Sequence, residues 1–166
     1  MPSIAIFNLN PITQFDPDEI RAAVTESNFH TLCDQYCLDP ALIQPALDSL
    51  EIQVPDLEKV PLFGLRFAPE PTAPIIVNCW RESERVAAYI HTYTSVAPAL
   101  VQNHLSLSKE VFIVELQRLQ SADLGMLFAY ELARWLAFRG GGWVYGFEGA
   151  WYRLNAHKAF LPVIQQ

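Results

Sequence analysis

SADLGMLFAYELARWLAFRGGGWVYGFEGAWYRL, residues 121–154, predicts a long apolar helix, a glycine stop and an aromatic hairpin. Residues 124–138 contain no proline and are mostly good helix formers. Large apolar residues recur at helical spacing and three alanines form a second stripe, so we expect this helix to be buried. Ser121 is the expected N-cap, and Gly140 is the expected left-handed stop. The triple glycine does not match a phosphate loop, because a helix precedes it and a strand follows.

Residues 143–154 predict a β-hairpin with a two-residue Glu-Gly loop. This register places Tyr145 opposite Tyr152. Because side chains alternate along a strand, these two tyrosines then share an inward face, while Trp151 and Arg153 share the outward face. We therefore expect Trp151 and Arg153 to form an exposed aromatic and cationic spot of the kind that binds a protein partner.

Length and composition indicate one globular domain. A chain of 166 residues is long enough to bury a core, and 51% hydrophobic with only 17% charged residues excludes disorder. No apolar run approaches the ~20 residues that span a bilayer, so we expect no membrane insertion. The sequence also lacks a signal-peptide pattern. Three cysteines are too few for a disulfide scaffold, which favours a reducing cytoplasm.

The negative charge is concentrated in the first third of the chain. Residues 1–60 contain ten acids against Arg21 and Lys59, a balance of −8, whereas residues 61–166 contain eight acids and nine bases, a balance of +1. Such a surface repels nucleic acid and steers association toward a basic protein. The alternative is that these carboxylates are simply solvated on helix surfaces. The acids that we expect at a partner surface are Asp16, Asp18, Glu19, Asp34 and Asp39.

The hydrophobic pattern of the whole chain predicts an α+β fold. The expected strands cover residues 3–9, 62–68, 75–80 and 110–116, and the further expected helices begin after Asp16, at Phe29, after Asp39 and at Pro98. Together with the hairpin, these segments predict a single domain with a mostly antiparallel sheet of five to six strands. The sheet is expected to pack against the long helix of the C-terminal half, beside a helical N-terminal third (residues 1–60).

Two segments carry conflicting signals. Residues 85–94 alternate as in a strand, yet Val86, Ile90 and Tyr93 also fit one face of a helix. Their tyrosine, isoleucine and threonine content favours the strand. Pro45 lies inside the third of the expected N-terminal helices and should kink or split it.

His30, Cys33 and Cys37 are the candidate metal ligands, because they fall at i, i+3 and i+7 on one helix face. A zinc site needs a fourth ligand, which only the fold can supply. The alternative is that the two thiols are buried and behave as small hydrophobic groups. We therefore expect no metal and no cofactor.

Glu131 is the candidate catalytic residue, because it falls between Leu127 and Trp135 within the apolar stripe of the long helix. A buried carboxylate needs a partner or a proton, and a raised pKa in a pocket marks a functional acid. The alternative is a structural ion pair or a position at the rim of the core. Its expected partners are Arg153, Arg85, Arg66 or a tyrosine hydroxyl.

The absence of a reactive cluster predicts a non-catalytic protein-binding module, acting as an adaptor, an assembly factor or an acidic inhibitor. Over about the last forty residues, the long helix, glycines and aromatic hairpin loosely resemble small bacterial immunity-type proteins. That resemblance implies an acidic inhibitor that docks on a basic toxin or nuclease. The alternative function is a small-molecule-binding protein or hydrolase-like enzyme with a pocket around Glu131. A mean hydropathy of +0.14 also favours a face covered by another protein or by a second copy of this chain.

Overall fold

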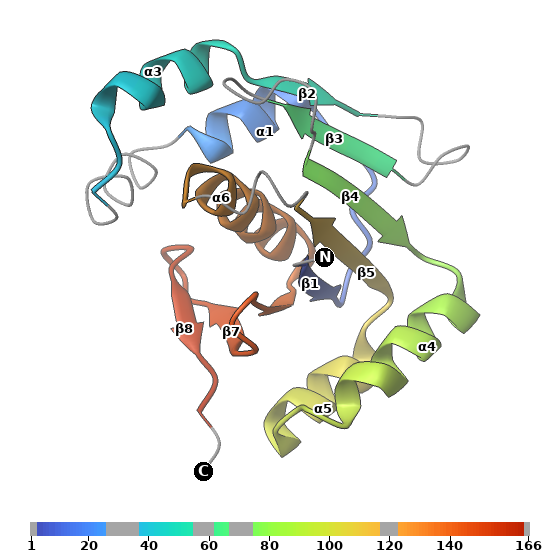
Figure 1. Cartoon of the computed structure of the whole chain (residues 1–166). Coiled ribbons are helices and arrows are strands. Elements are labelled where there is room, and N and C mark those ends of the chain that lie inside the picture. The colour runs from blue at the N-terminus through green and yellow to red at the C-terminus, as the bar shows by residue number, and fades with distance from the viewer. Residues whose placement is uncertain (1–2, 26–36, 55–61, 67–74, 117–122, 165–166) are drawn as a thin grey trace.

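The computed structural model describes residues 3–25, 37–54, 62–66, 75–116 and 123–164. An antiparallel sheet runs through the molecule in the order β2-β3-β4-β5-β1-β6-β7-β8 (Figure 1). The strands are β1 (Ser3–Asn8), β2 (Glu51–Gln53), β3 (Leu62–Arg66), β4 (Ile75–Trp80), β5 (Glu110–Glu115), β6 (Trp143–Tyr145), β7 (Trp151–Leu154) and β8 (Phe160–Pro162). The helices are α1 (Pro17–Val24), α3 (Pro40–Asp48), α4 (Ser83–Thr94), α5 (Ala99–Leu107) and α6 (Asp123–Gly140).

This arrangement confirms the expected α+β class, with an antiparallel sheet and a long helix in the C-terminal half of the chain. The sheet has eight strands rather than five or six. The two additional strands, β2 and β8, are three residues long and lie at the two ends of the sheet. Strands this short do not produce a clear alternating pattern in the sequence.

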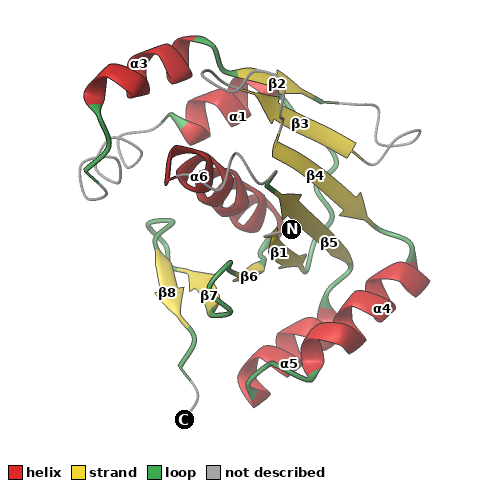
Figure 2. Cartoon of the chain, viewed as in Figure 1, coloured by secondary structure: helices red, strands yellow, loops and turns green. Residues whose placement is uncertain are grey.

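Helices cover both faces of the sheet (Figure 2). Residues of α1, α3 and α6 pack in one layer, and residues of α4 and α5 pack in the other. Strand β1 contributes to both, because Ile4 and Ile6 belong to the α6 layer while Ala5 and Phe7 belong to the α4–α5 layer. All four side chains are fully buried. The neighbouring strand β5 is likewise buried on both faces, as its uninterrupted apolar sequence predicts.

Helix α6 is the buried helix that the alanine and leucine stripes predict, and every residue from 131 to 137 is buried. The helix continues through Gly140, and Gly141 takes the left-handed conformation with φ +63°. The stop is therefore one residue later than expected. The N–H of Gly142 then donates to the carbonyl of Ala137 at 2.7 Å, which closes the helix end. The expected cap, Ser121, lies outside the described residues.

The triple glycine makes room for Asn8, a fully buried residue at the end of β1. A Cβ atom on Gly140 or on Gly142 would overlap the Asn8 side chain. Asn8 Nδ2 donates to the carbonyl of Leu136 at 3.2 Å, and the N–H of Asn10 donates to the carbonyl of Gly140 at 3.0 Å. The glycines thus join the end of α6 to the end of β1.

The N-terminal helices begin where the capping signals predict. Asp16 accepts a hydrogen bond from the N–H of Asp18 at 2.9 Å, and Asp39 accepts one from the N–H of Ala41 at the same distance. Helix α3 continues through Pro45, so Pro45 does not split the helix, which was one of the two expected effects. The carbonyl that loses its helical donor belongs to Ala41, which is exposed and open to water.

Residues 85–94 form part of helix α4, so the strand favoured by their composition is wrong. Val86 is buried, and Ile90 and Tyr93 pack beside it in the α4–α5 layer at the helical spacing i, i+4 and i+7. Packing of this stripe against the sheet outweighs the β preference of individual residues. The threonines are accommodated because Thr94 Oγ1 donates to the carbonyl of Ile90 at 2.6 Å.

The hairpin forms with a register one residue away from the expected one. Tyr145 lies opposite Trp151, and Val144 lies opposite Tyr152. The loop therefore covers residues 146–150, with the N–H of Gly146 donating to the carbonyl of Ala150 at 2.9 Å. A shift of one residue moves every side chain of a strand to the other face, so the expected sharing of a face by Tyr145 and Tyr152 is wrong.

The position of Glu148 explains the longer loop. The hydroxyls of Tyr130 on α6 and Tyr152 on β7 both donate to its carboxylate. Tyr130 also accepts the N–H of Phe147 at 3.1 Å. Burial raises the pKa of Glu148, and the two tyrosine hydroxyls lower it by more, so its pKa lies below the ordinary value. A two-residue Glu-Gly turn would not leave this carboxylate between the two hydroxyls.

Candidate functional site

Trp151 is a core residue and not part of an exposed spot. Its side chain is only 4% exposed. Its ring lies 4.8 Å from that of Tyr145, 5.8 Å from that of Phe7 and 6.3 Å from that of Tyr93, measured between centroids. The expectation that it would lie on the surface is wrong, because the shifted hairpin register directs it into the α4–α5 layer. Burial raises the pKa of Tyr93 within the same cluster.

Arg153 lies on the surface, as expected, and borders a groove between α5 and the end of β8. We call this the α5–β8 groove. It consists of two adjoining cavities of about 540 Å³ and 470 Å³ that share Pro98, Pro162 and Val163. The described residues that line it are Ser95, Val96, Ala97, Pro98, Ala99, Leu100, Gly149, Ala150, Trp151, Arg153, Pro162, Val163 and Ile164.

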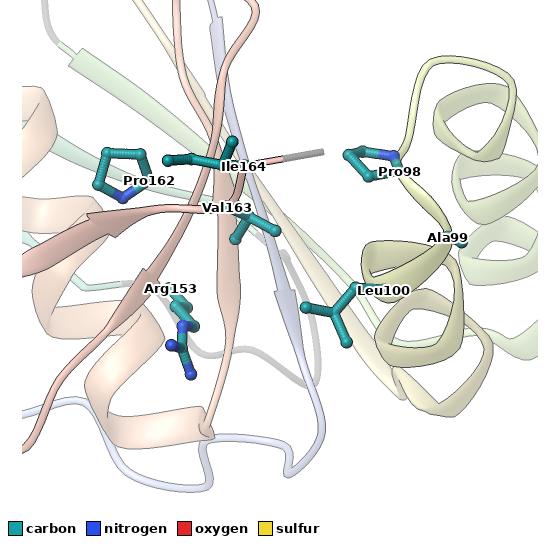
Figure 3. A pocket seen from close by; sticks show the side chains of 7 residues that line it. All are labelled: Pro98, Ala99, Leu100, Arg153, Pro162, Val163 and Ile164. Carbon is teal, nitrogen blue, oxygen red and sulfur yellow. The ribbon is translucent and has the colours of Figure 1, made fainter. Parts of the chain in front are cut away.

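The walls of the groove come from three segments that are far apart in the sequence. The α4–α5 turn and the first residues of α5 form one wall, and the residues that follow β8 form the other. In Figure 3, Leu100 on α5 and Val163 extend toward one another across the opening, with Arg153 beside them. The hairpin loop closes one end, where Trp151 forms part of the surface of the second cavity. The groove is thus the place where the two candidate hairpin residues meet the α4–α5 layer.

Exposed aliphatic side chains surround the groove. Val96, Leu100 and Ile164 are 58%, 59% and 78% exposed. Single exposed hydrophobic residues are common, but these three line one continuous depression. An apolar surface gathered in this way is a typical binding feature of protein surfaces.

The described residues that line the groove carry one charge, which is positive. No acidic residue occurs among the lining residues, and Arg153 is their only basic one. Among the described residues, no carboxylate lies within ion-pair distance of Arg153. A guanidinium beside an aliphatic surface is well suited to a carboxylate from a ligand, because it donates two parallel hydrogen bonds to the carboxylate oxygens while the ligand covers the pair from solvent.

The free edge of β8 is unsuited to pairing with an added strand. The residues that flank β8 bond toward β7, since the N–H of Val163 donates to the carbonyl of Trp151 on β7 and the N–H of Asn155, directly after β7, donates to the carbonyl of Ala159. Because hydrogen bonds alternate along an antiparallel strand, Pro162 directs its backbone away from β7. Proline has no N–H to donate at that position, which protects the edge.

The N-terminal acids serve mainly the protein's own structure. Asp16 and Asp39 are helix caps. Glu19 lies 3.5 Å from the guanidinium of Arg139 and accepts the indole N–H of Trp135 at 3.4 Å. Asp18 is exposed in the first turn of α1. The fifth candidate, Asp34, lies outside the described residues.

Glu131 is buried and forms an ion pair with Arg134, one turn along the same helix. None of the four partners suggested by the sequence is involved in this pair. The cavity that Glu131 lines has a volume of about 20 Å³, the size of a single water molecule. The geometry at Glu131 therefore matches the structural ion pair, and the cavity that it lines with other described residues is this small one.

The candidate metal ligands are only partly covered by the structure. Cys37 is exposed with φ 53°, and His30 and Cys33 lie outside the described residues. Within the parts of the chain that are described, no group of three or more histidine, cysteine, aspartate or glutamate side chains is arranged to hold a metal ion.

A polar cluster around Glu110 was not singled out by the sequence. Glu110 is fully buried at the start of β5, pairs with Arg81 and accepts the N–H of Ile12 at 3.1 Å. Burial raises the pKa of Glu110 against the lowering effect of these donors. Burial and the Glu110 charge also raise the pKa of Cys79 to about 12, so this thiol is inert at neutral pH. The sequence signal that could have identified it is an acid at the first position of an inner strand, directly before four apolar residues.

Comparisons with known proteins give no family assignment. No protein-family model, no curated protein and no solved structure matches the chain. None of the helices in the described segments is long and apolar enough to cross a bilayer. The function therefore has to be argued from the geometry of the groove.

Proposed function

We propose that this chain is a non-catalytic protein-binding module that acts through the α5–β8 groove. The observation that carries the proposal is an open depression that combines exposed aliphatic walls with Arg153, a cation that has no acid partner among the described residues. Its aliphatic residues can bury apolar surface of a partner, which favours association. Its arginine can fix the orientation of the partner and select for a complementary charge. An adaptor, an assembly factor or an inhibitor would use such a surface.

The acidic surface of α1 and α3 is a second part of this proposal. It lies in the layer opposite to α4 and α5, so the two surfaces engage different proteins or different parts of one partner. Exposed carboxylates such as Asp18 steer a basic partner at long range. An immunity-type inhibitor of a basic toxin or nuclease would use this surface.

Affinity capture from the native cell with mass spectrometry tests the groove. The bait is the full chain as wild type, as Leu100→Lys in the groove, or as Leu107→Lys on the same helix. Leu107 is 65% exposed and does not line the groove, so its variant is a matched control. We expect partners that bind the wild type and the Leu107 variant to be lost from the Leu100 variant. Identical partners on all three baits would contradict the proposal.

A fourth bait tests the acidic surface. The changes Asp16→Asn, Asp18→Asn, Glu19→Gln and Asp39→Asn remove four charges, and asparagine preserves both helix caps. We expect this bait to lose basic partners and to retain partners of the groove. If it retains basic partners at low and high salt, the acidic surface has no role in steering.

A further inference from the structure

We propose that the α5–β8 groove binds an acidic, aliphatic segment of another protein, with a carboxylate of that segment paired to Arg153. This inference rests on the proposed protein-binding function and specifies the chemistry of the partner. It is carried by the charge of the groove, by the edge of β8 and by the surface that a second copy of the chain would offer.

The first argument is that Arg153 borders the groove with no acid partner in the described part of the chain, whereas four other described arginines are paired with acids. Arg21 on α1 also has no acid partner among the described residues, but it does not line the groove. The acid-paired arginines are Arg81 with Glu110, Arg85 with Glu82, Arg134 with Glu131 and Arg139 with Glu19. Arg153 has no such acid among the described residues, although it lies at the rim of an apolar depression where a bound segment would cover it from solvent. An arginine in this setting favours a planar anionic group that accepts two parallel hydrogen bonds.

The second argument concerns how the segment can bind. The backbone of Pro162 faces the free edge of β8 without an N–H, so an added strand would miss a hydrogen bond at the groove. Recognition therefore depends on side chains that enter the space between Leu100 and Val163, and on the charge opposite Arg153. Leucine, isoleucine or valine beside aspartate or glutamate supplies both features.

The third argument concerns a second copy of this chain as the occupant. A twofold contact centred on the groove would place groove against groove. Two Arg153 side chains would then approach each other with no carboxylate from either lining. Such a contact between like charges is unfavourable. An acidic segment from a different protein would instead place a carboxylate opposite Arg153.

A random 12-residue peptide library displayed on phage provides the test, with the full chain immobilised as wild type, Arg153→Glu, Leu100→Lys or Leu107→Lys. We expect wild type and the Leu107 variant to select peptides in which acidic residues adjoin aliphatic ones. The Arg153→Glu variant should select lysine and arginine at those positions. A synthetic wild-type-selected peptide should bind Arg153→Glu about tenfold or more weakly than wild type, by titration calorimetry. Equal melting temperatures would show that the variants are folded.

The possible outcomes separate the two proposals. Selected peptides that need Leu100 but show no preference for acids, and no reversal with Arg153→Glu, overturn the acidic partner and leave the groove as a binding site. Peptides that bind Leu100→Lys as well as wild type overturn both. Acidic selection that reverses with the charge at residue 153 supports both.

Discussion

Asn8 shows how one polar residue determines the use of a glycine cluster. Its side chain occupies the space above Gly140 and Gly142 and donates to the carbonyl of Leu136. A Gly-Gly-Gly sequence suggests flexibility or phosphate binding when it is considered alone. Here it allows two backbones to approach a buried amide, which is a packing role.

Replacing Gly140 with alanine should therefore destabilise the fold by about 1–3 kcal/mol, because the new methyl group overlaps the Asn8 amide. The measurement is the free energy of unfolding from urea denaturation. The control is Gly141→Asn, since asparagine tolerates the φ of +63° and the nearest atom is 3.7 Å away. Equal destabilisation by both changes would show that Asn8 does not restrict this site.

The Glu148 carboxylate gives a prediction about pH. Its folded-state pKa lies below the ordinary 4.5, so its contribution to stability is present above pH 4.5 and is lost as the pH falls through the folded-state value. At neutral pH, Glu148→Gln should cost about 1 kcal/mol, because Tyr130 and Tyr152 lose an ionised acceptor that is partly screened by solvent.

Denaturation of wild type and Glu148→Gln between pH 3 and pH 7 measures this difference. We expect the two curves of stability against pH to converge at the acidic end. The variant Tyr152→Phe should show the same trend with a smaller difference, because one hydroxyl remains on the carboxylate. If the difference in free energy of unfolding between wild type and Glu148→Gln were the same at every pH, the ionised carboxylate would be excluded as the cause of that difference.

At the scale of elements, β8 combines a strand edge with the wall of the groove. Its backbone pairs with β7 on one side, and Pro162 limits pairing on the other. An exposed edge that can pair is a route to association between molecules. The proline therefore allows a partner to bind through side chains in the groove while it discourages the addition of a strand at this edge.

Pro162→Thr should increase self-association, because it restores an N–H donor on the free edge together with a residue that favours strands. Chromatography with light scattering over a range of protein concentrations measures this. Pro162→Lys is the control, since it restores the same N–H but adds a charge that discourages edge pairing. The wild-type trace also tests the homo-oligomer that the hydropathy suggests. If the threonine variant elutes like wild type at every concentration, the proline does not protect the edge.

At the scale of the molecule, the sheet is shared by two apolar layers. Leu132 on α6 is buried in one layer and Leu105 on α5 is buried in the other. Because β1 and β5 contribute side chains to both, neither layer can lose its packing without disturbing the other. We therefore expect the domain to unfold as one cooperative unit.

Leu105→Ala and Leu132→Ala test this directly. Each should lower the free energy of unfolding by about 2–5 kcal/mol, because each leaves a cavity in a close-packed layer. Far-UV circular dichroism and tryptophan fluorescence should report one coincident transition in both variants, since Trp135 lies in the α6 layer and Trp151 in the other. Separate transitions for the two signals in Leu105→Ala would show that the layers unfold independently.

Local signals in the sequence predicted local structure well. Capping at Asp16 and Asp39, the buried α6 and the inner strand β5 all depend on residues near one another in the chain. The predictions were wrong where contacts between residues far apart in the sequence determine the local structure. Tyr130 on α6 sets the hairpin loop through Glu148, and packing against the sheet makes residues 83–94 helical.

The candidate site was predictable only in part. The sequence identified Arg153 and its neighbour Trp151, but it assigned Trp151 to the surface because the register was off by one residue. The groove itself joins residues 95–100 to residues 162–164, and no spacing within the sequence relates those segments. The pairing of β7 with β8 places residues 162–164 beside the start of α5 and so brings the two segments together.

The central position of β1 has a consequence for synthesis of the protein on the ribosome. Its partners are β5 and β6, so each residue of β1 pairs with one that is made more than 100 residues later. Until then the nascent chain carries an unpaired strand whose four central residues, Ile4 to Phe7, are apolar and uncovered on both faces. The sheet cannot be completed until nearly all of the described chain has emerged. A translation pause before residue 143 would therefore expose an aggregation-prone intermediate, which chaperones are expected to bind.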